Sequence, residues 1–274
     1  MKTYNLLFTN RYSLIQTFTK IKNSKIYCEK DSFAEKFCKQ KKIIYKTYSS
    51  KNDFYKILKK NLNHKIFTNG CKYLIPKHLL KKQRFIPLNI HPSLLPNFRG
   101  KYPINRIFYN KEKYIGITIH QIDEGIDTGK ILHQKKFKVK KNYLIINFYH
   151  KHFHLEKVVF EQFFFKKKKI NLRLKKKKEL LIKKKKKYKI EDLKELPVEY
   201  IQSQCVPKKY LKVIIGSKLR KIVHCQEIKS NLFKDKKFFY LYLSKNHILI
   251  RNIKKKKFII FLLIKINMSN YFNL

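Results

Sequence analysis

Up to about residue 165, the chain alternates short apolar runs with longer segments of helical periodicity. Runs such as Asn5–Thr9 and Lys65–Asn69 have the length of buried strands. Segments such as Ser13–Lys22 and Phe54–Leu62 instead have the length and spacing of helices. Because strands that alternate with helices build a parallel sheet with helices on both faces, the sequence predicts an α/β domain. Its sheet should be Rossmann-like, doubly wound and mostly parallel.

The other elements expected in this region continue the alternation. Further strands are expected at Lys25–Cys28, Ile43–Thr47, Leu88–His91, Gly116–Ile122 and Ile131–Val139. Further helices are expected at Ser32–Gln40, Tyr102–Asn110 and Leu144–Phe165. No Gly-x-Gly-x-x-Gly pattern follows the first strand, so the sequence does not predict a dinucleotide site.

Two polar residues end one of the expected strands. Asn89 and His91 are two residues apart, so on an extended backbone their side chains leave the same face. Pro92 cannot donate to a central ladder, and the strand should therefore stop at about His91. This places an amide and an imidazole at the carboxyl end of a strand, where open α/β sheets bind their ligands. The alternative is a strand-end pair that merely caps a loop.

A second polar cluster follows the strand expected at Gly116–Ile122. The strand runs into a loop with two glycines and three carboxylates, on Asp123, Glu124 and Asp127. Alone, Asp127 would be read as a turn residue. Within the strand, alternation places His120 on the polar face, which makes it a further candidate to line the site.

These stretches together resemble the folate-dependent formyltransferases. The resemblance lies in Asn-Ile-His-Pro-Ser-Leu-Leu-Pro with its following Arg-Gly (Asn89–Gly100), in Gly-Ile-Thr-Ile (Gly116–Ile119) and in Asp-Glu-Gly-Ile-Asp-Thr-Gly (Asp123–Gly129). Within the family, Arg99–Arg106 is most similar to the methionyl-tRNA formyltransferases. The resemblance implies the formyltransferase fold. It also implies transfer of a formyl group from 10-formyltetrahydrofolate to the α-amino group of methionyl-initiator tRNA, for translation initiation.

The residues of the two clusters suit this chemistry. Formyl transfer passes through a tetrahedral centre that carries a developing oxyanion. Asn89 and His91 can donate hydrogen bonds to that oxygen. Asp127 can hold His91 in position, or accept the proton of the amine directly or through a water. The resemblance selects Asp127 over the neighbouring Asp123 and Glu124 as the third catalytic residue.

The resemblance also implies a site for the folate donor. An apolar wall would hold the pterin and aminobenzoyl rings, with backbone groups for the polar contacts. The loop Ile122–Asp127 would form the opposite side of this pocket. The residues implied for the wall are Ser93, Leu94, Leu95 and Pro96.

No metal is expected in the protein. His150 and His154 would share one face of a helix, with His152 between them in sequence. No carboxylate or cysteine completes a convincing tetrahedral set, so these are read as surface or partly packed histidines.

Beyond residue 165 the composition changes. Residues 166–194 contain lysine runs at 166–169, 175–178 and 183–187, which predict an extended linker. The sequence therefore predicts a catalytic domain at 1–165 and a smaller domain at 195–274. Several short strands in this second part suit an OB-like β-barrel that binds tRNA. Its strands are expected at Leu211–Ile215, Leu219–His224, Phe238–Leu243, His247–Asn252 and Lys257–Ile266.

The charge balance favours a polyanionic partner. The chain has 67 Lys and Arg against 17 Asp and Glu, a formal net charge of +50. Such an excess supports RNA binding, although drift towards A/T-rich codons would also produce many lysines. The five cysteines form no Cys-x-x-Cys pair, and the longest late apolar run, Phe258–Ile264, is too short to span a membrane. A cytoplasmic protein, without a membrane partner and monomeric, is expected.

The chain departs from the family pattern in two places. The tRNA-specific members carry an insertion after the second strand, whereas here Cys28 is followed directly by a helix. The usual glycine after the first strand is replaced by Thr9-Asn10-Arg11. How the initiator tRNA is recognised therefore stays open. The alternatives are a phosphoribosylglycinamide formyltransferase, a sugar-nucleotide formyltransferase and a catalytically inactive RNA-binding protein.

Overall fold

The computed structural model describes two continuous stretches, residues 2–139 and residues 145–167. Further along the chain it describes residues 172, 174, 176, 179, 188–189, 193, 198–204, 211–215, 218–228, 240–244, 247–252 and 257–264. The chain divides into two compact units. The first comprises Met1–Ile104, Lys113–Lys141 and Phe148–Lys178, and the second comprises Asn105–Glu112, Asn142–Asn147 and Glu179–Leu274. The domain boundaries expected at 165 and 195 stay predictions, and most of the expected lysine-rich linker lies outside the described residues.

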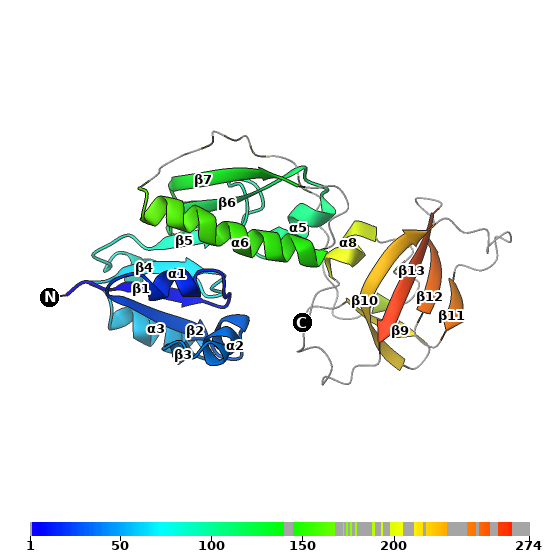
Figure 1. The fold of residues 1–274 in the computed structure, drawn as a ribbon, viewed down its shortest axis with the longest axis horizontal. Coiled ribbons are helices and arrows are strands. Elements are labelled where there is room, and N and C mark those ends of the chain that lie inside the picture. The colour runs from blue at the N-terminus through cyan, green and yellow to red at the C-terminus, as the bar shows by residue number, and fades with distance from the viewer. Residues whose placement is uncertain are drawn as a thin grey trace. The chain divides into compact units, whose positions relative to one another are not determined.

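The first unit contains a mixed seven-stranded sheet (Figure 1). Its strand order is β3-β2-β1-β4-β5-β6-β7. Strands β1 to β5 pair in parallel, whereas β6 runs antiparallel to both β5 and β7. The α/β class is thus confirmed, with a parallel part and an antiparallel edge. The strands are β1 Asn5–Thr9, β2 Ser24–Glu29, β3 Lys46–Tyr48, β4 Lys65–Asn69, β5 Leu88–His91, β6 Tyr114–Gln121 and β7 Ile131–Lys138.

Local capping explains where two of the helices begin. The Ser32 hydroxyl accepts a hydrogen bond from the backbone N–H of Glu35, which starts α2 at Phe33. Ser50 and Asp53 form a capping box, so α3 begins three residues earlier than its first apolar residue, Phe54. The helices are α1 Ile15–Thr19, α2 Phe33–Gln40, α3 Lys51–Lys59, α4 Lys77–Leu80, α5 Pro103–Tyr109 and α6 Ile145–Phe164.

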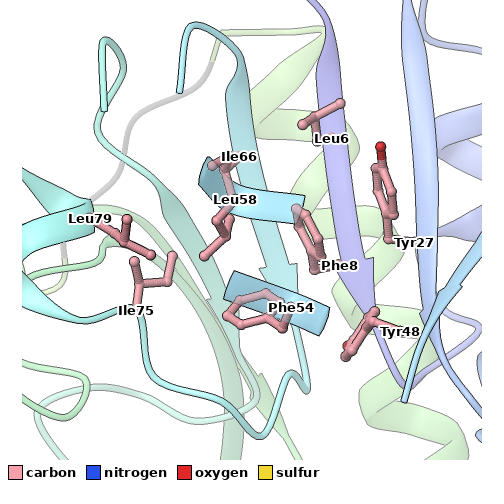
Figure 2. Packing of buried hydrophobic residues seen from close by; sticks show 9 residues of the cluster. All are labelled: Leu6, Phe8, Tyr27, Tyr48, Phe54, Leu58, Ile66, Ile75 and Leu79. Atoms are coloured by element: carbon pink, nitrogen blue, oxygen red, sulfur yellow. The ribbon is translucent and has the colours of Figure 1, made fainter. Parts of the chain in front are cut away.

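The sheet of the first unit is covered on both faces. On one face, Phe8 of β1 packs against Phe54 of α3, with ring centroids 5.2 Å apart. The cluster around this pair is shown in Figure 2 and comprises Leu6, Phe8, Tyr27, Tyr48, Phe54, Leu58, Ile66, Ile75 and Leu79. On the other face, Phe67 of β4 contacts Phe18 of α1 and Phe160 of α6 at centroid distances of 5.6 Å. Apolar burial on both faces is what a doubly wound sheet requires.

The strand order reverses between β1 and β4. From β1 the chain adds β2 and β3 on one side, and it then crosses to add β4 and β5 on the other. Ligands of open α/β sheets bind beside such a reversal, outside the carboxyl ends of the strands. The fold therefore places its binding site near the ends of β4 and β5.

The second unit contains a six-stranded sheet of order β11-β12-β13-β10-β9-β8. The expected hairpin is confirmed, because β9 and β10 pair antiparallel with Lys218 opposite Ile215. The helix α8, Val198–Ser203, lies on β10, where the Gln202 side chain donates to the Cys225 carbonyl at 3.1 Å. The strands are β8 Tyr188–Lys189, β9 Leu211–Ile215, β10 Lys218–Ile228, β11 Tyr240–Ser244, β12 His247–Asn252 and β13 Lys257–Ile264.

Among the residues that the structure describes, no helix is long and apolar enough to cross a membrane.

Candidate active site

Strand β5 carries Asn89 and His91 at the carboxyl edge of the sheet. Its register with β4 places Thr68 beside Asn89, and its register with β6 places His120 on the other side. Asn89 is therefore held between two polar residues of neighbouring strands.

The amide of Asn89 has a fixed orientation. Its Oδ1 accepts a hydrogen bond from the Thr68 hydroxyl at 2.9 Å. Its Nδ2 lies 3.1 Å from His120 Nε2 and 3.2 Å from Asp127 Oδ1. Because the amide group has two N–H bonds, both donors are directed into the same small cluster.

The loop after β6 returns Asp127 to this cluster. Asp127 has a left-handed backbone with φ of 53°, a conformation that Asp adopts more readily than most residues. Gly129 allows the loop to close, since a Cβ there would lie 2.0 Å from the Gln121 carbonyl oxygen. With the loop in this position, Asp127 Oδ2 accepts from the backbone N–H of Gly100 at 2.8 Å.

These contacts determine the charge of Asp127. Burial alone would raise the pKa of its carboxyl group. The neighbouring imidazoles of His120 and His91 and the hydrogen bond from the Gly100 N–H outweigh burial and hold the pKa of Asp127 well below its ordinary value. Asp127 is therefore a carboxylate at neutral pH.

His91 lies between two acceptors. Its Nδ1 is 3.3 Å from Asp127 Oδ2, and its Nε2 is 3.0 Å from the Phe98 carbonyl oxygen. Only the protonated ring could donate to both. Burial opposes protonation and lowers the pKa of His91 to about 4, although Asp127 and the Phe98 carbonyl act in the opposite direction. At neutral pH, His91 is thus a buried neutral imidazole beside a carboxylate that would stabilise its cation.

His120, which the sequence indicates only through strand alternation, belongs to the same cluster. Its Nδ1 lies 2.7 Å from the Gln121 carbonyl oxygen, so Nδ1 carries the proton. In the neutral ring, Nε2 then accepts from Asn89. Nε2 also lies 3.5 Å from Asp127 Oδ1. The site therefore holds two imidazoles, one on each of the antiparallel strands β5 and β6.

A cavity that is open to solvent lies beside this cluster, and its volume is about 540 Å³ when that open space is included. Asn89, His120 and Asp127 are among its lining residues, whereas His91 lies behind them. The remaining lining residues are Thr68, Cys71, Tyr73, Leu74, Ile75, Ile122, Asp123, Glu124 and Gly125.

The cavity has two walls of different character. The segment Cys71–Ile75 is apolar except for Lys72, and its role in the site was not anticipated from the sequence. The loop Ile122–Asp127 forms the other wall, with Ile122, Asp123, Glu124, Gly125 and Asp127 in the lining. The first wall is assembled by tertiary packing, because Ile75 is anchored in the cluster of Figure 2.

The segment Ser93–Pro96 does not contribute to the lining of this cavity. The Ser93 hydroxyl donates to the Asn97 carbonyl at 2.7 Å, and both Ser93 and Leu95 are buried. The Leu94 side chain lies over Gly116, where a Cβ would come within 2.2 Å of it. The segment thus packs β5 against β6, and its contact with a folate stays a prediction.

Among the described residues, no group of three His, Cys, Asp or Glu side chains is arranged to hold a metal ion. On α6, His150 and His154 are exposed, whereas His152 is fully buried. His152 Nδ1 donates to the Phe148 carbonyl at 2.7 Å. The three histidines therefore do not converge, and the burial of His152 exceeds the partial packing expected for it.

Fold and site together define a class of protein. A doubly wound sheet presents an amide, an imidazole and a carboxylate beside a cavity at the carboxyl ends of its strands. Hydrogen-bond donors and a carboxylate beside a cavity suit a transferase that acts on the carbonyl group of a small donor.

The comparison with known families agrees with a transferase of this kind. The family described as "Formyl transferase" matches residues 14–163, more than half of the chain, so the chain belongs to the formyl transferase family.

Curated relatives match over shorter stretches. The chain is 38% identical over 90 residues to the methionyl-tRNA formyltransferase of Caldicellulosiruptor saccharolyticus, which covers 33% of the chain and 29% of that relative. It is 46% identical over 69 residues to the methionyl-tRNA formyltransferase of Orientia tsutsugamushi, which covers 25% of the chain and 22% of the relative. The chain thus spans less than a third of the length of these relatives.

Solved structures share the fold. WlaRD, a sugar 3N-formyl transferase crystallised with dTDP and 5-N-formyl-THF, superposes with a TM-score of 0.60 at 18% identity. The match covers 97% of this chain and all of that one. HypX from Aquifex aeolicus gives the same TM-score at 13% identity and covers 95% of this chain and 44% of its own. At these identities the likeness concerns the fold alone.

Proposed function

We propose that this protein transfers the formyl group of 10-formyltetrahydrofolate to the α-amino group of methionyl-initiator tRNA. One observation carries the proposal: Asn89 and His91 both lie within hydrogen-bonding distance of Asp127, beside an open cavity. The names of the curated relatives favour methionyl-tRNA as the acceptor.

The reaction begins when the free amine attacks the formyl carbon. The electrons of the C=O bond move to oxygen, and the tetrahedral centre carries an oxyanion. An N–H of Asn89 is the donor for this oxygen. The N–H that points to His120 would leave that contact and donate to the oxyanion instead. The other N–H stays on Asp127, because a hydrogen bond to a carboxylate is charge-assisted and stronger.

The carboxylate of Asp127 stabilises the positive charge that forms on the attacking amine. The attacking amine becomes an ammonium, and the ionised Asp127 stabilises this charge and any charge on His91. The ammonium proton then leaves to Asp127, directly or through a water. Collapse of the tetrahedral centre breaks its bond to N10 of the folate, which takes up a proton and departs as tetrahydrofolate.

The cavity provides the space for the donor. Its apolar wall, Cys71–Ile75, suits the flat rings of the folate, and the loop Ile122–Asp127 offers polar groups opposite. The segment Ser93–Pro96 would contribute from the β5 side, through backbone contacts to the donor and by packing β5, which carries Asn89, against β6. No metal is needed for any of these steps.

The second unit would hold the RNA. Its antiparallel strands suit an OB-like barrel, and the lysine-rich segment 166–194 could reach the phosphates of the tRNA. An enzyme of this function would act in the cytoplasm, and nothing in the proposed reaction requires more than one copy of the chain.

A direct assay tests the proposal. Purified protein is supplied with 10-formyltetrahydrofolate and, in separate reactions, methionyl-initiator tRNA, glycinamide ribonucleotide or a dTDP-linked amino sugar. Formyl incorporation into the tRNA alone is expected, and Asn89→Ala should lower its rate by roughly two to three orders of magnitude. Formylation of another acceptor in its place would contradict the assignment. Formylation of none of the three acceptors would contradict the proposed activity.

A further inference from the structure

Positive charges lie over an aromatic ring at the amino ends of the parallel strands, the end of the sheet opposite the catalytic cluster. In Figure 1, β1 begins at this end, beside the labelled N-terminus. Tyr4 directly precedes β1, and its ring centroid lies 4.0 Å from Lys25 Nζ and 5.8 Å from Lys2 Nζ. Lys25 reaches the ring because the parallel register places Asn5 of β1 beside Ser24 of β2. Both distances are those of cation–π contacts.

A second ring with two cations adjoins the first. Lys65, the first residue of β4, donates its backbone N–H to the Tyr4 carbonyl at 3.0 Å. Its Nζ lies 5.6 Å from the centroid of the Phe85 ring, and the Arg84 guanidinium lies 5.5 Å from the same ring. Lys65 thus connects the two rings into one surface. This amino-end surface comprises Lys2, Tyr4, Lys25, Lys65, Arg84 and Phe85.

No carboxylate neutralises the charge of the amino-end surface. Within the part of the chain that the structure describes, none of its four cations forms an ion pair with Asp or Glu. Other lysines of the first unit are held by carboxylates, as Lys39 is by Glu35 and Lys72 is by Glu29. Here aromatic rings order the cations instead, and their charge stays available to an anion from outside.

The chemistry of this surface fits RNA. Lysine and arginine bind phosphates, while aromatic rings and the guanidinium plane of arginine stack on unpaired bases. Lys65 and Arg84 are exposed, and the rings of Tyr4 and Phe85 are half-buried, so a strand of RNA can reach all four. The five residues of β4 span roughly 17 Å between this surface and the carboxyl ends of the strands. RNA bound here would therefore not occupy the catalytic cluster.

We propose that the amino-end surface binds single-stranded RNA through its phosphates, separately from the catalytic cluster. The inference goes beyond the proposed function, because it places an RNA contact on the first unit at the end of the sheet where no formyl transfer takes place. It does not depend on the identity of the formyl acceptor. Phosphates would bind Lys2, Lys25 and Lys65, and one base would stack on Arg84 or Phe85.

The salt dependence of RNA binding to the full chain tests the inference. The probe is a fluorescein-labelled oligouridylate of about 15 nucleotides, close to the largest site of one single-strand-binding module. Lys25→Met combined with Lys65→Met removes two of the four cations. The association constant should then fall less steeply with salt. The slope of its logarithm against the logarithm of salt concentration should decrease in magnitude by about 1.4, because each phosphate contact on a single strand contributes about 0.7.

Lys51→Met combined with Lys136→Met is the matched control. Each of these exposed lysines also lies over one aromatic ring, 5.4 Å from the centroid of Tyr55 and 4.5 Å from that of Tyr114. The control loses the same charge, but from outside the amino-end surface, and its slope should stay close to that of the wild type. An equal change of slope in both double variants would overturn the inference, because binding would then follow total charge alone.

Photo-crosslinking locates the bound RNA. With an oligouridylate that contains 4-thiouridine, peptide mass spectrometry should find crosslinks at Tyr4 or Phe85 in the wild type and in the control. The crosslinks should be lost in the Lys25 and Lys65 double variant, and their absence from the wild type would overturn the inference. Vesicles of phosphatidylserine and phosphatidylcholine test a lipid partner instead. Vesicle binding that needs Lys25 and Lys65, together with an unchanged slope for RNA, would assign the surface to a membrane and contradict the proposal.

Discussion

Asp127 Oδ2 lies 3.3 Å from Nδ1 of His91, while the opposite nitrogen of the same ring faces the carbonyl oxygen of Phe98. The carboxylate thus touches a ring that has acceptors on both sides. Burial keeps that ring neutral at neutral pH, and a second proton would satisfy both contacts. The pair is therefore arranged to stabilise positive charge at the moment when the attacking amine acquires it.

Removing the charge of Asp127 tests that role. Asp127→Asn keeps the size of the side chain, and Asn tolerates the left-handed backbone at this position. We expect kcat to fall about 100-fold or more, with the KM for the folate donor little changed. Single-turnover formylation measures the chemical step. A variant with normal single-turnover rates would show that Asp127 serves the loop rather than the reaction.

Asn89→Ala removes the donor for the oxyanion. Loss of one such donor lowers turnover by roughly two to three orders of magnitude. Thr68→Val is the matched comparison, because it deletes only the hydroxyl that orients the amide of Asn89. It should cost far less, about tenfold at most, since the bond is neutral. Equal losses in the two variants would mean that orientation of the amide, and not its presence, controls the rate.

Two buried imidazoles make the protein sensitive to mild acid. Burial lowers the pKa of both His91 and His152 to about 4, whereas an unfolded chain has histidines near the ordinary value. Between about pH 6.5 and 4 the unfolded state therefore binds more protons, and stability falls as the pH falls. Above pH 6.5 this contribution is fully present.

His152→Leu separates the contribution of His152 to this pH dependence from that of His91. It removes one titrating ring from a fully buried position that does not line the cavity. The urea midpoint, followed by circular dichroism from pH 7.5 to 4.5, should fall less steeply in the variant. Between pH 7.5 and 4.5 the free energy of unfolding should fall by roughly 3 kcal/mol less in the variant than in the wild type. Parallel curves for the two proteins would contradict the shifted pKa of His152.

The strands that build the site could be predicted because pattern and burial agree. β1, β4 and β5 have the expected bounds, since each is short, apolar and bordered by polar or turn residues. For β3, pattern and burial disagree, so the strand expected at Ile43–Thr47 lies at Lys46–Tyr48 in the structure. The apolar pair Ile43-Ile44 favours a strand, yet Ile44 is 94% exposed, and the residue that the core buries is Tyr48.

The polar residues of the site could be predicted from sequence motifs, but its apolar wall could not. Asn89, His91 and Asp127 stand in sequence patterns whose residue types indicate their chemistry. The wall Cys71–Ile75 has no such pattern, and it faces the cavity because Ile75 is held by the tertiary core. The place of His120 likewise depends on the register between β5 and β6, which local sequence does not encode.

The closure of the loop Ile122–Gly129 depends on a missing side chain. A Cβ on Gly129 would lie 2.0 Å from the backbone oxygen of Gln121, so Gly129→Ala must displace the loop that carries Asp127. A shift of about 1 Å at a catalytic group costs on the order of 100-fold in rate. Gly125→Ala is the comparison, because there the three atoms nearest to a Cβ all belong to the Thr128 side chain. It should retain more activity than Gly129→Ala in the same formylation assay.

A buried ion pair joins the end of β1 to α6. The carboxylate of Glu156 is fully buried, and it pairs with Arg11 and accepts from the Ser13 hydroxyl at 2.5 Å. Arg11→Met would leave this carboxylate buried without its cation, at a cost of about 3–5 kcal/mol. Arg11→Met combined with Glu156→Leu removes both charges and should recover most of that loss, because apolar side chains of similar volume often replace buried pairs without penalty. Urea unfolding of the two variants measures the difference. If the double variant is no more stable than Arg11→Met alone, the pair contributes through its geometry, with Ser13 and Glu156 holding the loop after β1, and charge compensation is not its main effect.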